Sequence, residues 1–229
     1  MKMVHCFDDF IETLLNAGFS MGGGNDEGIY AIIPWGWNEA PPYETPICWH
    51  TENPDTDPWE WRIRVLDERN DIAYSKLFFK KSGFITRQWY PYFLAVRRGN
   101  MSFDEAYNDG TISHHAKRIY DAVKSSVALP TQDIKTLAGF GREDKSKFDR
   151  ALTELQMRMF LTMCGRQHKP NNSAWSSTVF CTTEHFFGDA VFEEAAEIGA
   201  DEAHERIRAQ ILKLSPTAQE KKIGKFILG

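Results

Sequence analysis

The residues best suited to chemistry lie between Trp35 and Trp61, where five of the seven tryptophans occupy a Pro- and Gly-rich stretch. Large aromatic side chains in an irregular stretch either fill a core or line a cleft, because an exposed cluster leaves an adhesive surface. Aromatic walls stack flat ligands such as nucleobases, and nearby carboxylates and arginines fix polar edges. One interpretation is a binding pocket lined by Trp35, Trp37, Trp49, His50, Trp59, Trp61, Arg62 and Trp89. The alternative is that the tryptophans are ordinary core residues and that Asp57–Pro58 only begins a helix.

A second group of candidates lies between residues 131 and 182, where the pattern predicts two helices followed by a two-stranded polar hairpin. The first helix is expected to start with Thr131 as its cap and to stop at the breakers around Gly139. The second carries an apolar stripe at helical spacing: Phe148, Leu152, Leu155 and Met159. The expected strands are residues 160–164 and 177–182, which are rich in β-branched and aromatic residues. This order predicts a winged helix, which commonly contacts duplex nucleic acid.

Basic side chains in this module are the candidate nucleic-acid contacts. They are Lys145, Lys147, Arg150 and Arg158 on the second helix, and Arg166, His168 and Lys169 at the hairpin tip. From Ile112 to Trp175 there are eleven Lys and Arg against six Asp and Glu, so the remainder of this chain of net charge −5 carries −10. A basic module inside an acidic protein is compatible with phosphate contact. Residues 143–158 alone have four acids and four bases, a balance that is also typical of a solvated face or a protein-binding module.

Around this module the sequence predicts an α+β, mostly helical protein, with a central winged helix-turn-helix and small β-hairpins packed against N- and C-terminal helices. One hairpin is expected over residues 72–79 and 83–85. Thr86 is expected to cap a helix that runs to about Arg98, and Ser215 and Pro216 to begin the last helix. The expected parts are a helical, aromatic-rich region over 1–110, a winged-helix domain over 111–187 and C-terminal helices over 188–229.

Composition indicates a cytoplasmic protein without membrane contact. No apolar run approaches the ~20 residues that span a bilayer, and Asp8 and Asp9 interrupt any signal-like apolar segment. Four cysteines without CxxC spacing favour a reducing compartment. Cys164-x3-His168 and Cys181-x3-His185 offer two thiols and two imidazoles, but their spacing does not match a zinc knuckle. We therefore expect no metal and no cofactor.

Several runs of residues are long enough to indicate a family. They are Trp49–His50–Thr51, Asp57–Pro58–Trp59–Glu60–Trp61, the run from Ser82 to Pro91 (SGFITRQWYP), the run from Phe148 to Met157 (FDRALTELQM), and Thr178–Val179–Phe180 before Glu184–His185–Phe186–Phe187. In these motifs the chain resembles the AlkZ-related proteins, from about residue 5 to the C-terminus. The resemblance implies kinship with the winged-helix AlkZ/YcaQ DNA glycosylases, which excise alkylated bases and unhook crosslinks.

The resemblance implies fold more directly than activity. Those glycosylases use a Gln-x-Gln or Gln-x-Asp motif, which the N-terminal half of this chain lacks. If bases are excised, Asp57 is the candidate water-activating carboxylate, with Trp49, Trp59 and Trp61 stacking the base. The sequence thus favours a binder of duplex DNA without catalysis. The alternatives are a DNA glycosylase-like hydrolase, and a module that binds a nucleobase, another small molecule or a protein in the tryptophan pocket.

Overall fold

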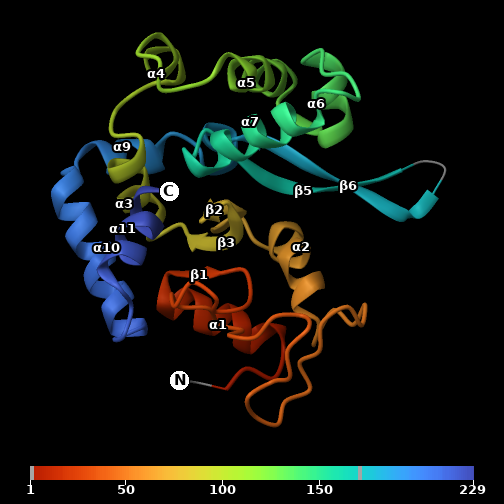
Figure 1. Ribbon diagram of the computed structural model, residues 1–229, viewed down its shortest axis with the longest axis vertical. Coiled ribbons are helices and arrows are strands. Elements are labelled where there is room, and N and C mark those ends of the chain that lie inside the picture. The colour runs from red at the N-terminus through yellow and green to blue at the C-terminus, as the bar shows by residue number, and fades with distance from the viewer. Residues whose placement is uncertain (1–2, 170–171) are drawn as a thin grey trace.

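The computed structural model describes residues 3–169 and 172–229 and shows an α+β protein with more helix than strand (Figure 1). The elements are α1 (Phe7–Ala17), β1 (Phe19–Met21), α2 (Pro58–Glu68), β2 (Ile72–Phe78), β3 (Lys81–Thr86), α3 (Tyr90–Arg97), α4 (Phe103–Asn108), α5 (His114–Ser126), β4 (Ala128–Pro130), α6 (Thr131–Leu137), α7 (Lys145–Met157), β5 (Leu161–Lys169), β6 (Asn172–Thr182), α8 (Thr183–Phe187), α9 (Ala190–Ala196), α10 (Ala200–Leu214) and α11 (Glu220–Leu228). Among the described residues, no helix is long and apolar enough to cross a membrane.

The strands of the described chain join in one antiparallel sheet in the order β1-β3-β2-β5-β6-β4. Both predicted hairpins are confirmed, as β2–β3 and β5–β6. Their union in one sheet is not what the sequence suggested. It depends on the pairing of Tyr74 in β2 with Met163 in β5, and no local pattern encodes so distant a contact. This pairing brings the hairpin of the N-terminal half beside the hairpin of the second half.

Three hydrophobic cores hold the described residues together. The first packs α1 against α2 and includes Phe10 and Trp61. The second includes Phe19 of β1, Phe93 of α3 and Phe226 of α11, so the C-terminal helices share a core with the first half of the sheet. The third is built by α4 to α7 with β5 and β6. The division at residues 110 and 187 stays a prediction, although the third core coincides closely with the expected central part.

The third core belongs to a unit whose elements follow each other as helix, strand, helix, helix, strand and strand, from α5 to β6. Ser113 begins α5, where its Oγ accepts a hydrogen bond from the Ala116 amide at 3.2 Å. Gly139 follows α6 with a φ of +68°, which reverses the chain before α7. The short strand β4, which the sequence analysis missed, pairs with β6. The β5–β6 hairpin projects beyond the body of the molecule (Figure 1).

Three of the predicted helix starts are wrong. Thr86 is the last residue of β3, and the next helix begins only at Tyr90. Thr131 is the first residue of α6 rather than its cap, and its hydroxyl donates to the Thr178 carbonyl at 3.0 Å. Ser215 ends α10 and does not begin α11. Ser and Thr also bond to backbone in turns and strands, so a hydroxyl before an apolar run does not specify a helix start.

Candidate nucleic-acid interface

Helix α7 shows one face to the third core and the other to solvent. Phe148, Leu152 and Leu155 are buried, as their spacing predicts. Gln156, next to this stripe, is also buried and ties α7 to β2. Its Oε1 accepts hydrogen bonds from Ser75 Oγ at 3.1 Å and from the Lys76 amide at 3.0 Å. The solvent face of α7 therefore lies beside the β2–β3 hairpin.

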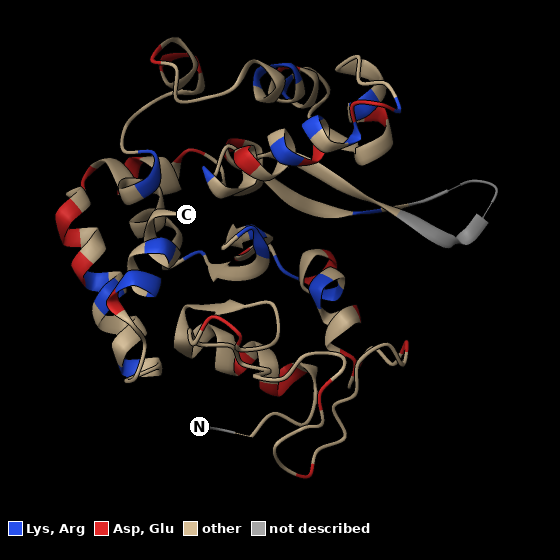
Figure 2. Ribbon diagram, in the orientation of Figure 1, with Lys and Arg blue, Asp and Glu red and all other residues tan. Residues whose placement is uncertain are grey.

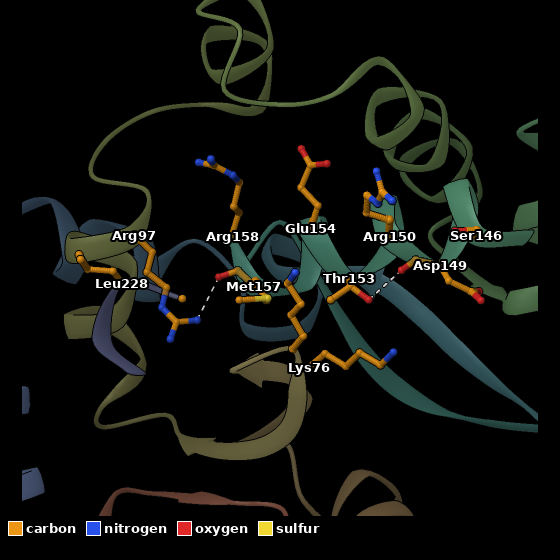
Figure 3. A pocket seen from close by; sticks show the side chains of 12 residues that line it. Lys76, Arg97, Ser146, Asp149, Arg150, Thr153, Glu154, Met157, Arg158 and Leu228 are labelled. Atoms are coloured by element: carbon orange, nitrogen blue, oxygen red, sulfur yellow. Dashed lines mark hydrogen bonds between the residues drawn. The ribbon is translucent and has the colours of Figure 1, made fainter. Parts of the chain in front are cut away.

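The solvent face of α7 forms the floor of a groove with a volume of about 630 Å³ (Figure 3). Among the described residues, five cations line this groove without a carboxylate at ion-pair distance. Arg97 is held by backbone carbonyls, and the other four are Lys76, Lys80, Arg150 and Arg158. We call them the unpaired basic set. Arg150 and Arg158 point to the same side of α7, and Lys76 extends from β2 toward this helix (Figure 3). The sequence analysis missed Lys76 and Lys80, because only tertiary packing brings them to α7.

The acidic residues of the groove have partners of their own. Asp149 Oδ2 accepts from Lys145 Nζ at 2.7 Å. Glu154 accepts from both the Ser113 amide and the Ser113 hydroxyl, each at 2.8 Å, so it helps to hold the start of α5. Lys145 offsets the charge of Asp149, whereas Glu154 keeps its negative charge because Ser113 is neutral. The groove is still positively charged, because the four cations of the unpaired basic set outnumber the two carboxylates.

The two lysines predicted at the start of α7 are neutralised by neighbours on the same helix. Lys145 pairs with Asp149, and Lys147 Nζ lies 2.8 Å from Asp144 Oδ1. The hydrogen bond from Lys147 lowers the pKa of the Asp144 carboxyl, and it raises the pKa of Lys147 in return. Basic and acidic residues alternate along this helix (Figure 2). The cations of this helix segment without an acidic partner are therefore Arg150 and Arg158.

The hairpin contributes less than the sequence suggested. Arg166 on β5 lies 3.5 Å from Glu60 on α2, and its side chain is only one-third exposed, at 33%. The side chains of His168 and Lys169 lie outside the described part of the structure. The single basic patch expected from α7 and the hairpin is therefore not seen, because three of its five described cations have acidic partners.

Beneath the groove, Arg97 joins three elements through backbone carbonyls. Its guanidinium donates to Leu77 O at 2.8 Å, Met157 O at 3.0 Å, Phe226 O at 2.6 Å and Ile227 O at 2.8 Å. These carbonyls lie at the C-terminal ends of β2, α7 and α11. Carbonyl groups at helix C-termini attract cations. Burial lowers the pKa of Arg97, while the four acceptors favour its charged form. Arg97 therefore fixes α7 relative to the rest of the protein.

The tryptophans divide between core and surface. Trp35 and Trp61 are buried at 3% and 1% exposure, and Trp89 packs edge-on against Phe19 with ring centroids 5.4 Å apart. These three match the core interpretation. Trp37 and Trp59 instead are 71% and 42% exposed.

The exposed Trp37 and Trp59 and the partly buried Trp49 lie around His50. Its ring centroid lies 6.2 Å from Trp37, 6.5 Å from Trp49 and 4.9 Å from Trp59. The Arg62 guanidinium lies 3.2 Å from the centroid of Trp59 and thereby covers one face of that ring. The predicted pocket residues thus form a surface cluster and a separate core group.

Asp57 is the cap of α2 and is completely buried. Its Oδ1 accepts from the amides of His50 and Trp59 at 3.1 and 2.8 Å, and its Oδ2 from those of Thr51 and Glu52 at 2.8 and 3.0 Å. His50 and Glu52 have φ values of 60° and 61°, so the carboxylate holds a loop in a conformation that non-glycine residues rarely adopt. This geometry favours the helix-start interpretation of Asp57–Pro58 over the water-activating role.

We expect Asp57→Asn to destabilise the protein by about 2 kcal/mol, because the new amide places N–H groups against backbone N–H donors. Thermal unfolding monitored by circular dichroism measures this loss. Asp55→Asn is the control, since Asp55 pairs on the surface with Arg64, and we expect it to unfold close to the unmodified protein. A variant at Asp57 that melts normally but loses base release from alkylated duplex would instead assign catalysis to this residue.

Of the four residues considered for zinc, the side chains of Cys164, Cys181 and His185 lie in the described part of the structure. Within the described residues there is no group of three or more His, Cys, Asp or Glu side chains arranged to hold a metal ion. The thiols of Cys164 and Cys181 do approach each other across β5 and β6.

Comparison with known proteins gives one match. The family model described as AlkZ related matches residues 4–228, which is nearly the whole chain. No curated protein and no solved structure matches the chain. The resemblance found in the sequence motifs is therefore confirmed.

Proposed function

We propose that this chain, which belongs to the AlkZ-related family, binds nucleic acid by its phosphate backbone in the groove on α7. The observation that carries this proposal is the unpaired basic set, four cations that line one groove from α7 and from the β2–β3 hairpin. Lys and Arg that neutralise phosphates release counterions, and this supplies most sequence-independent affinity for nucleic acid. Cations without internal partners need not break an ion pair before they contact a phosphate.

We further propose that residues 111–187 are a winged helix and that the partner is duplex DNA. The order of elements from α5 to β6 supports this assignment. In helix-turn-helix proteins the second helix of the motif meets the major groove, and α7 follows α6 in that position. A duplex lying on α7 would place its flanking backbone on Lys76 and Lys80.

The proposed activity is binding without base excision. Both oxygens of Asp57 are occupied by backbone amides, and the N-terminal half lacks the glutamine motif of the AlkZ/YcaQ enzymes. A gel-shift series with intact duplex, alkylated duplex and single-stranded DNA at two ionic strengths tests this proposal. We expect duplex retention that weakens with salt and no loss of bases. Absence of retention on every DNA would overturn the binding proposal, and base release would replace it with a glycosylase-like enzyme.

A substitution at Lys80 is expected to change DNA affinity and the stability of the fold in opposite directions. Phe79 and Lys80 form the turn between β2 and β3 with φ values of 51° and 63°, a left-handed conformation that favours Asn and Gly. We expect Lys80→Gly to stabilise the fold by about 1 kcal/mol, because strain is relieved. The same change should weaken DNA binding, since one cation of the groove is lost.

Chemical unfolding and fluorescence anisotropy with a labelled duplex measure the two effects of this substitution. Lys81→Ala is the matched control, because Lys81 is the next residue and already pairs with Asp26 and Glu27 at 3.2 and 3.4 Å. We expect the control to keep its DNA affinity. Equal losses of DNA affinity in both variants would show that affinity depends on net charge alone, and would contradict a specific contact by Lys80.

A further inference from the structure

Two cysteines lie on the β5–β6 hairpin. Cys181 pairs directly with Thr162, Cys164 lies two residues further along β5, and both cysteines line the same pocket. The ladder shifts register between Met163 and Gly165, which makes Cys164 the extra residue of a bulge. Neither cysteine forms a disulfide.

The two thiols differ in their access to solvent. Cys181 is completely buried, whereas Cys164 is half-buried. Both line a pocket of about 520 Å³ that is bounded by α2, β4 and α8 and includes Arg166 and His185. The hairpin lies beside α2 at this point (Figure 1). A small molecule in the pocket can therefore reach Cys164 first.

We propose that Cys164 and Cys181 form an oxidisable dithiol that reacts with hydroperoxides and closes to a disulfide across the hairpin. In the first step the Cys164 thiolate attacks one peroxide oxygen, the O–O bond breaks, and the leaving oxygen takes a proton to become an alcohol or water. Cys164 is then a sulfenic acid. In the second step the Cys181 sulfur attacks the Cys164 sulfur, its proton goes to the departing hydroxyl, and one water leaves. Two thiols are oxidised, and one hydroperoxide is reduced.

The electrostatics of the pair assign these roles. The hydrogen bond from Cys181 lowers the pKa of Cys164 against the opposing effect of burial. The same hydrogen bond and the buried position raise the pKa of Cys181. Cys164 is therefore the attacking thiol and Cys181 the resolving one, since the thiolate is the nucleophile. This inference does not depend on the proposed nucleic-acid binding.

The first experiment uses the unmodified, fully reduced protein and hydrogen peroxide at one equivalent. Peptide mass spectrometry follows the oxidation of each cysteine over time. We expect Cys164 to react about tenfold faster than Cys48, although Cys48 is the exposed thiol. The expected product is an intramolecular link between the Cys164 and Cys181 peptides that dithiothreitol reverses. Faster oxidation at Cys48, or a product without this link, would overturn the proposal.

The second experiment separates the two roles in a Cys6→Ser/Cys48→Ser background. Adding Cys181→Ser removes the resolving thiol, so peroxide should leave a sulfenic acid on Cys164 that dimedone captures. Adding Cys164→Ser instead should leave Cys181 unmodified. Dimedone labelling of Cys181 in that variant would contradict the assignment. If either serine variant fails to fold, the background protein alone still shows whether both thiols disappear together.

Discussion

The double variant Arg150→Gln/Arg158→Gln is expected to bind duplex DNA about 30-fold more weakly than the unmodified protein, a loss of roughly 2 kcal/mol. Both arginines belong to the unpaired basic set and point to the same side of α7. Their removal deletes two phosphate contacts, so the slope of log affinity against log salt should fall by about 2. Fluorescence anisotropy titrations over a range of salt concentrations give both quantities.

The matched control is Lys145→Gln/Lys147→Gln. It removes the same charge from the same helix, but from two lysines that pair with Asp149 and Asp144. We expect this control to lose only a few-fold in affinity. If the two double variants weaken DNA binding equally, binding depends on the net charge of α7. Direct phosphate contacts by the unpaired basic set would then be excluded.

Replacement of Arg97 is expected to produce the largest loss of stability. Arg97→Met removes the guanidinium that donates hydrogen bonds to four carbonyls at the ends of β2, α7 and α11. Removal of a partner from buried polar groups costs about 3 to 5 kcal/mol. For a protein of this size, that loss lowers the melting temperature by about 10 °C. Arg97→Lys should recover only part of it, because an ammonium group lacks the planar fork of the guanidinium.

Differential scanning calorimetry measures these changes. Arg87→Met is the control, because Arg87 pairs on the surface with Glu194 at 2.6 Å, and we expect it to cost less than about 1 kcal/mol. A melting temperature for Arg97→Met close to that of the control would show that Arg97 does not hold the junction.

Local patterns predicted the helices well where one apolar stripe decides the structure. Phe7, Phe10, Ile11 and Leu14 of α1 are buried as their spacing requires. The short helix α4 begins with a complete capping box between Ser102 and Glu105, a signal that lies within one turn of the chain. Such elements follow from neighbours within one or two turns. The helix starts expected at Thr86 and Ser215 were wrong. A hydroxyl before an apolar run also occurs in turns and strands, and at Ser215 the following proline did not change this.

The candidate groove could not be predicted, because it is made by contacts between distant parts of the chain. Lys76 and Lys80 reach α7 through tertiary contacts, among them the hydrogen bonds of Gln156 to β2 and those of Arg97 to Leu77 and Met157. The neutralisation of Lys145 and Lys147, in contrast, was readable from the sequence, since Asp149 and Asp144 stand four and three residues away. Charge counts alone treat paired and unpaired cations alike.

The most direct test of the account is the salt dependence of duplex DNA binding by the unmodified protein. If the four cations of the unpaired basic set each neutralise one phosphate, log affinity should fall linearly with log salt with a slope of about −3 to −4. No measurable binding at low salt, or an affinity that does not change with salt, would contradict the assignment of this groove to nucleic acid.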